Sequence, residues 1–309
     1  MGASPARMVA LRVLYEVDFR GAHVGISLDD ALRRNHLPGR EKAFATELVY
    51  GVLRQKKTLD WVIELRSRWK ASEMTPWIRN ILRLGLYQFF FMDSVPVQAL
   101  VNEAVELAKV YGHPGTVKLV NGLLRGVSRD IPSRSLAEVP FPPLESDPAE
   151  HVAVRYSHPR WMVERWIKFF GLDEAIRICQ ANNARPPVAI RTNTLVTDPV
   201  TLRSNLERAG LTAEPSNLLP EGLRLSGLPD HPLEGLDAYK SGEFFVQDEG
   251  SMLVAYALSP EPGATIIDAC SAPGGKATHI AALMGDRGEI LAADIEDRPD
   301  NQTRFFVIG

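Results

Sequence analysis

The chain has 309 residues, a net charge of −3 and only two cysteines, which lie 91 positions apart. This length exceeds one average domain and allows two cores. Two distant cysteines argue against a disulfide-stabilised secreted protein and indicate a reducing compartment. The slightly acidic total charge does not by itself indicate a nucleic-acid partner.

The apolar stretches of the chain predict neither export nor a membrane span. Residues 1–7 lack the apolar segment of a secretory signal. The most apolar stretch, residues 84–92, is far shorter than the ~20 residues that a spanning helix needs. We therefore expect a cytoplasmic protein with no membrane partner.

The first 130 residues are expected to be helical and to contact RNA. From Val97 to Ala108 apolar side chains recur at the spacing of a one-sided helix, and Pro96 stands just ahead of them. Residues 1–140 carry a net charge of +6, whereas the remainder carries −9. Basic clusters in the positive part can neutralise phosphates, although solvated helix faces are the alternative explanation. The candidates are Arg33, Arg34, Arg54, Lys56 and Lys57, with a further basic run at 66–70.

Beyond these helices the pattern changes twice. Residues 131–147 are rich in proline and lack periodicity, so they are expected to be a linker. From residue 148 the pattern alternates between helices and short strands. Helices are predicted at 161–170 and 172–180, and strands at 188–190 and 244–246.

A glycine-rich turn between a strand and a helix is the most informative feature of the chain. The apolar run 265–267 leads into Asp-Ala-Cys-Ser-Ala-Pro-Gly-Gly-Lys at 268–276, and an amphipathic helix follows. A second apolar run, 289–293, ends in Asp294. A turn of this kind directs backbone N–H groups at a ligand, and an acidic residue ending the second strand is placed to accept ribose hydroxyls. The pair predicts a nucleoside-cofactor site, with an ordinary tight turn as the alternative.

The turn departs from the two common phosphate-binding patterns. A P-loop requires glycine where Cys270 stands and serine or threonine where Ala277 stands. A dinucleotide fingerprint requires three spaced glycines, and only the pair Gly274-Gly275 is present. An adenosyl group without phosphates fits this turn better.

Residues 268–276 closely resemble the S-adenosylmethionine motif of RNA cytosine-C5 methyltransferases of the Sun/Fmu type. Three further segments are similar to motifs of that family and follow the same order, namely 156–166, 182–193 and 242–251. The resemblance implies a Rossmann-like α/β methyltransferase domain that uses S-adenosylmethionine. The implied cofactor-binding residues are Cys270, Ser271, Ala272, Pro273, Gly274, Gly275, Lys276 and Asp294.

The N-terminal part carries a second resemblance. Residues 47–54, 82–88 and 121–125 resemble segments of the helical NusB-type RNA-binding domain. Within the methyltransferase family this fusion is similar to the bacterial enzymes that methylate small-subunit ribosomal RNA, which is therefore the expected partner.

These patterns divide the chain into five expected segments. An all-α NusB-like domain covers 1–130 and the linker covers 131–147. The N-terminal subdomain of the methyltransferase covers 148–240, and the beginning of the cofactor-binding domain covers 241–294. The tail 295–309 is atypical, since it resembles a short stretch of prephenate dehydratases.

The chemistry that the resemblance implies requires two cysteines. One thiolate adds to C6 of cytosine so that C5 can accept a methyl group, and a second cysteine assists release. Both family motifs follow the strand that ends at Asp294, and neither is present in these 309 residues. No catalytic residue is therefore assigned, and we expect a truncated, inactive chain. The alternative is a non-enzymatic RNA-binding or antitermination-type module with a vestigial methyltransferase domain.

Three other residues with reactive or metal-binding side chains receive structural assignments. Cys270 is expected to pack within the cofactor turn and Cys179 on the apolar side of a helix. His279 lacks a second ligand one turn later, so no metal site is predicted.

Overall fold

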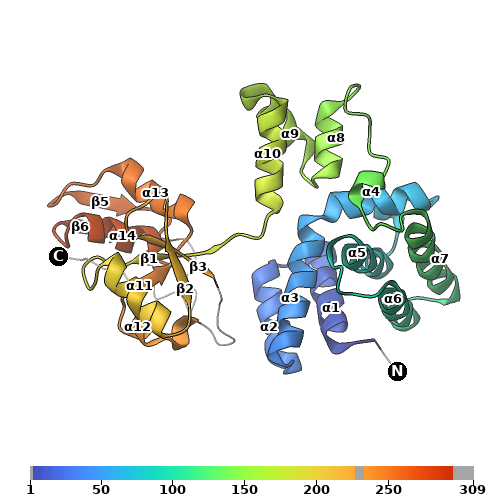
Figure 1. Cartoon of the computed structure of the whole chain (residues 1–309), viewed down its shortest axis with the longest axis horizontal. Helices are drawn as coiled ribbons and strands as arrows, with labels where there is room; N and C mark the ends of the chain where they lie inside the picture. Colours follow the sequence, from blue (N-terminus) through green and yellow to red (C-terminus); the bar gives the residue numbers. More distant parts are fainter. Residues whose placement is uncertain (1–2, 227–232, 295–309) are drawn as a thin grey trace. The chain divides into compact units, whose positions relative to one another are not determined.

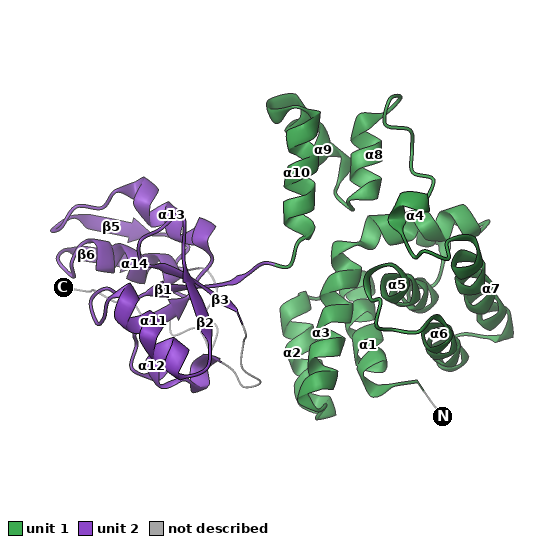
Figure 2. Cartoon of the chain, viewed as in Figure 1, with its two compact units in different colours: residues 1–185 green, residues 186–309 purple. Residues whose placement is uncertain are grey.

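The computed structural model describes residues 3–226 and 233–294 and forms two compact units, 1–185 and 186–309 (Figure 2). The tail 295–309, with its resemblance to prephenate dehydratases, lies outside the described residues. No helix in the described ranges is long and apolar enough to cross a membrane.

The first unit is helical, as predicted (Figure 1). Its first seven helices surround one large apolar core, and three further helices follow. The helices are α1 (Pro5–Arg20), α2 (Val24–Asn35), α3 (Gly39–Arg54), α4 (Lys56–Arg66), α5 (Pro76–Phe91), α6 (Val97–Tyr111), α7 (Pro114–Asp130), α8 (Pro148–Arg155), α9 (Arg160–Phe170) and α10 (Leu172–Asn183). The short 3₁₀ turns are Ala71–Glu73 and Leu136–Glu138.

The segments that resemble the NusB domain meet around α5, the most buried helix. A Cβ atom at Gly51 would lie 2.0 Å from the Tyr87 ring, and one at Gly85 would lie 2.8 Å from the Leu124 side chain. The Tyr87 hydroxyl donates a hydrogen bond to Glu47 at 2.6 Å. The two glycines in these segments therefore permit the close packing of α3 and α7 on α5.

A buried ion cluster lies beside the apolar core. Arg83 is almost fully buried and donates to Asp18 at 3.0 Å and to Asp60 at 2.7 Å. Arg79 and Lys56 also donate to the Asp18 carboxylate, at 2.6 and 2.8 Å. Burial raises the pKa of Asp18, but the hydrogen bonds and the positive charges of these neighbours outweigh it and hold the pKa well below its usual value.

The expected linker, 131–147, packs against the end of α5. The Arg134 guanidinium donates to the carbonyl oxygens of Gln88, Phe89 and Met92, and Val139 is buried. These bonds satisfy carbonyl groups that the end of α5 leaves open. The first compact unit continues to residue 185, so its boundary does not coincide with the predicted change at residue 148, and the five segments stay a prediction.

The second unit has a four-stranded antiparallel sheet and a two-stranded parallel sheet. The antiparallel sheet has the order β2 (Thr212–Pro215), β3 (Gly222–Ser226), β1 (Val188–Thr192) and β4 (Phe244–Val246). The parallel strands are β5 (Thr265–Asp268) and β6 (Glu289–Ala292). The helices are α11 (Pro199–Arg208), α12 (Asp237–Lys240), α13 (Glu249–Leu258) and α14 (Gly275–Leu283), with a 3₁₀ turn at Leu233–Gly235. The strands and helices predicted between residues 161 and 293 are confirmed, apart from differences of one to three residues at their ends.

Candidate cofactor site

The predicted strand, turn and helix form one β-α-β unit of the second compact unit (Figure 1). Strands β5 and β6 are parallel, with Ile266 opposite Ile290, so their carboxyl ends share one edge. Gly274 caps α14 with φ of +99°, a conformation that other L-residues rarely adopt. The glycine is therefore required by the backbone of the turn.

Asp294 lies directly against this turn. The backbone N–H of Ala272 donates to Asp294 Oδ2 at 3.0 Å, and the N–H of Ser271 donates to the carbonyl oxygen of Ala293 at 3.0 Å. The structure thus brings the turn and the acidic residue together, although Lys276 and Asp294 lie 18 positions apart in the sequence.

The turn presents polar groups that the described residues leave without partners. Ser271 is buried, and its Oγ has no hydrogen-bond partner among the described residues. The Oδ2 atom of Asp268 is also buried and also has no hydrogen-bond partner among them. No side chain caps the N-terminus of α14, so its first backbone N–H groups are available to a ligand. Buried polar atoms normally have partners, so these groups fit a polar ligand.

The other predicted cofactor residues differ in exposure. Ala272, Gly274, Gly275, Lys276 and Asp294 are partly buried, whereas Pro273 is exposed. Cys270 is exposed too, so the expectation that it packs within the turn is wrong. The neighbouring Ser271 takes the buried position instead.

Arg191 of β1 holds the N-terminus of α14, a role that the sequence analysis missed. Its guanidinium donates to the carbonyl oxygen of Gly275 at 2.6 Å, to Thr278 Oγ1 at 2.9 Å and to the Gln247 side chain. Burial lowers the pKa of Arg191 to about 10. Arg191 and Gln247 lie in segments that resemble family motifs, but the motifs alone do not reveal that both residues support the cofactor turn.

A second contact, made by His279, also holds α14. His279 is buried and its Nε2 lies 2.7 Å from Glu221 Oε1, while the Tyr256 hydroxyl donates to Glu221 Oε2 at 2.7 Å. Burial raises the pKa of Glu221, but the bonds from His279 and Tyr256 outweigh it and hold the pKa below its usual value. His279 therefore anchors α14 to the loop before β3.

Cys179 lies on the apolar side of α10, as predicted. Its side chain is fully buried, and burial raises the pKa of the thiol to about 11. A buried, protonated thiol is a poor nucleophile. The structure therefore assigns Cys179 to packing.

The five predicted RNA-binding residues lie in the first unit, and four of them have acidic neighbours. Arg33 and Arg34 lie within 3.9 Å of Asp29 or Asp30 on α2. Lys56 pairs with Asp18, and Lys57 lies 3.4 Å from Glu150. Arg54 ends α3 and is partly buried. RNA contact by these residues stays a prediction.

Three family profiles match the chain in consecutive regions. Residues 4–129 match the NusB family, residues 158–230 match the RsmF/B-like ferredoxin-like methyltransferase domain, and residues 255–303 match the 16S rRNA methyltransferase RsmB/F family. In chain order, the chain thus carries a NusB domain followed by methyltransferase regions of the RsmB/F type. The resemblances to the NusB domain and to the methyltransferases are thereby confirmed.

Individual relatives agree with this assignment. The chain is 34% identical over 296 residues to a probable ribosomal RNA small subunit methyltransferase B of Bacillus subtilis, covering 96% of the chain and 64% of that relative. It is 37% identical over 289 residues to a protein of the same description from Synechocystis, covering 94% and 63%. The chain thus spans less than two thirds of these relatives.

One solved structure supports the fold over nearly the whole chain. The crystal structure of PH0851 matches with a TM-score of 0.66 and 24% identity, covering 96% of this chain and 65% of PH0851. The helical first unit and the α/β second unit thus recur together in a known protein.

Proposed function

We propose that these 309 residues supply the cofactor-binding and RNA-binding parts of an S-adenosylmethionine-dependent methyltransferase that acts on C5 of a cytosine in 16S ribosomal RNA. The observation that carries the proposal is the contact between the glycine-rich turn and Asp294 at the shared edge of β5 and β6. The match of residues 255–303 to the RsmB/F methyltransferases supports the reaction class, and the relatives from Bacillus subtilis and Synechocystis are described as probable small-subunit rRNA methyltransferases.

The turn has hydrogen-bond donors and acceptors that suit this cofactor. Asp294 would accept the ribose hydroxyls, and the free N–H groups at the start of α14 would receive the carboxylate of the methionine part. Ser271 Oγ and Asp268 Oδ2 are buried acceptors close to the same turn. When bound, the cofactor supplies an electrophilic methyl group. The described residues bind and orient it, and neither Cys179 nor Cys270 is assigned as the nucleophile.

The helical unit would contact the RNA. Residues 4–129 match the NusB family, and residues 1–140 carry a net charge of +6. A positive domain attached to the catalytic one favours association with phosphates in a salt-dependent way.

A genetic experiment in the source organism tests the proposal. Deletion of the gene should remove 5-methylcytosine from at least one position of 16S rRNA, as mapped by bisulfite sequencing. The intact gene and a Glu261→Ala control, whose exposed side chain lies before β5, should restore the mark. Asp294→Ala should not restore it.

Two outcomes would contradict the proposal. If deletion leaves every 5-methylcytosine of 16S rRNA in place, the protein is not this methyltransferase, and the non-enzymatic RNA-binding function is favoured. If Asp294→Ala restores the mark as well as the intact gene does, the cofactor site lies elsewhere.

A further inference from the structure

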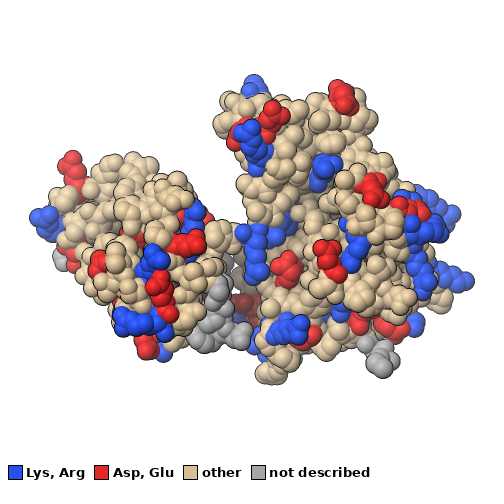
Figure 3. Space-filling model, in the orientation of Figure 1, with Lys and Arg blue, Asp and Glu red and all other residues tan. Residues whose placement is uncertain are grey.

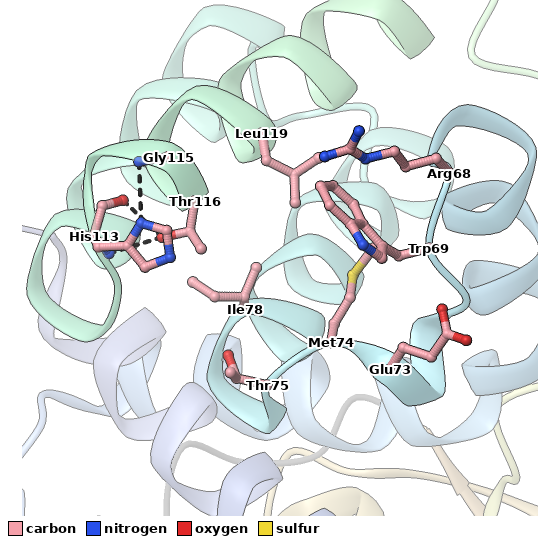
Figure 4. Close-up of a pocket in the computed structure, with 10 residues that line it drawn as sticks. All are labelled: Arg68, Trp69, Glu73, Met74, Thr75, Ile78, His113, Gly115, Thr116 and Leu119. Atoms are coloured by element: carbon pink, nitrogen blue, oxygen red, sulfur yellow. Dashed lines mark hydrogen bonds between the residues drawn. The ribbon is translucent and has the colours of Figure 1, made fainter.

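A pocket of about 440 Å³ opens on the first unit between the segment after α4 and the start of α7 (Figure 4). Trp69 forms one wall and is 42% exposed, although tryptophan is usually largely buried. Met74 and Ile78 lie at its base, and Thr116 lies on the side opposite Trp69. The pocket therefore combines a partly exposed aromatic ring with an apolar floor.

Arg68 lies over the Trp69 ring, with its guanidinium carbon 4.1 Å from the ring centroid. This stacking holds the indole in place and sets a positive charge at the mouth of the pocket. Arg68 forms no ion pair with any acidic residue in the described ranges. Glu73 also lines the pocket, but its carboxylate accepts a hydrogen bond from the backbone N–H of Lys70 at 2.9 Å.

A second hollow of about 360 Å³ shares Leu119 with the pocket and follows α7. Its floor includes Gly122 and Gly126, where an added Cβ would meet nothing within 4 Å. Four Lys or Arg residues and two acidic residues line the two hollows together, namely Arg66, Arg68, Lys118, Arg129, Glu73 and Asp130. Figure 3 shows Lys and Arg side chains gathered at the edge of the molecule that α7 forms.

We propose that the Trp69 pocket binds an unstacked base of single-stranded RNA, while Arg68 and Lys118 contact the neighbouring phosphates. An aromatic platform beside a positive groove is the arrangement by which proteins hold single strands, because every base offers a face for stacking. The inference rests on the proposed function insofar as RNA is the substrate. It goes further, since it assigns the binding to this face and not to Arg33, Arg34, Arg54, Lys56 and Lys57.

The charge pattern favours this face over the residues predicted from sequence. Lys118 is exposed and has no ion pair among the residues that the structure describes, whereas Lys56 and Lys57 pair with Asp18 and Glu150. A cation already paired with a carboxylate has less to gain from a phosphate. Arg66 and Arg129 pair with Asp130, so Arg68, from the basic run at 66–70, and Lys118 become the main candidates.

Fluorescence anisotropy with the 309-residue chain and a labelled single-stranded RNA from 16S rRNA, about 12 nucleotides long, tests the inference. Trp69→Ala should weaken binding about 5- to 150-fold, which corresponds to the loss of one stacked base. Trp69→Phe, which keeps an aromatic face, should retain most of the affinity. Phe169→Ala removes another exposed aromatic side chain from the same unit and serves as the control.

Salt dependence provides the second readout. Arg68→Gln and Lys118→Gln should each reduce the slope of log affinity against log salt by about 0.7, as expected for one phosphate contact on a single strand. Arg33→Gln, which removes a charge from α2, should leave the slope unchanged. Circular dichroism of every variant checks that the helices are retained.

The outcomes separate this inference from the proposed function. If the chain binds the RNA and Trp69→Ala binds equally well, the inference is wrong and the pocket is left for a protein partner, while the methyltransferase proposal stands. If the unaltered chain binds no single-stranded RNA at low salt, the inference is likewise overturned. The 16S rRNA methylation experiment then still decides the proposed function independently.

Discussion

Replacing Arg191 by methionine should destabilise the cofactor turn and lower S-adenosylmethionine affinity at least tenfold. The substitution keeps an unbranched side chain but removes three hydrogen bonds, to Gly275, Thr278 and Gln247. Each buried group left without a partner costs about 1–3 kcal/mol. We expect the free energy of unfolding of the second unit to fall by about 3 kcal/mol, because the contributions are not fully additive.

Hydrogen–deuterium exchange of residues 275–283 and calorimetric titration with S-adenosylmethionine measure the two effects of Arg191→Met separately. Arg203→Met on α11 is the matched control, since this arginine is half-exposed and pairs only with Glu207 one turn later among the described residues. Unchanged exchange in α14 and unchanged affinity in Arg191→Met would show that Arg191 does not support the site.

The largest effect on the first unit is expected for Asp18→Asn. The substitution removes a carboxylate that is 7% exposed and leaves Arg79 and Arg83 with one partner fewer. Breaking a buried ion cluster from one side costs about 3 kcal/mol or more. All five tryptophans lie in residues 1–185, so tryptophan fluorescence during urea unfolding reports on this unit alone.

The same carboxylate predicts a dependence of stability on pH. The pKa of Asp18 is lower in the folded protein than in the unfolded chain, where it is about 4. The contribution of Asp18 to the free energy of unfolding is therefore fully present above about pH 4 and is lost as the pH falls toward the pKa of the folded protein. The unaltered chain should therefore lose stability below about pH 4, and Asp18→Asn should lack this part of the acid dependence. Asp29→Asn, on exposed α2, is the control and should unfold like the unaltered chain. A large loss in the control, or none in Asp18→Asn, would contradict the role of the ion cluster.

Local patterns were sufficient to predict the strand-turn-helix unit and the position of Asp294. Glycines at a turn, an apolar strand before it and an acidic residue after the next strand depend on short stretches of sequence. The helical first unit could be predicted from the helical spacing of apolar side chains, because that spacing indicates which side chains face a core.

Long-range contacts explain what the sequence analysis missed. Arg191 reaches Gly275 across 84 positions of sequence, and that contact exists only after β1 pairs with β4 and α14 packs beside them. The ion pairs of Lys56 and Lys57 also join residues far apart in sequence, so their charges were counted as available for phosphates. The exposure of Cys270 depends on which residue of the turn faces inward, and composition does not reveal this.

Calorimetric titration of S-adenosylmethionine into the 309-residue chain and its Asp294 variants tests the cofactor site most directly. We expect measurable binding that Asp294→Ala weakens at least tenfold, since a lost charge-assisted hydrogen bond costs about 1.5–3 kcal/mol. The amide oxygen in Asp294→Asn can still accept the hydrogen bond from the backbone N–H of Ala272. A loss of affinity in that variant therefore reports on contacts between residue 294 and the ligand, and not on its contact with the turn. Glu261→Ala should bind like the unaltered chain. Equal affinity in all four proteins would contradict the claim that this turn and Asp294 form the cofactor site.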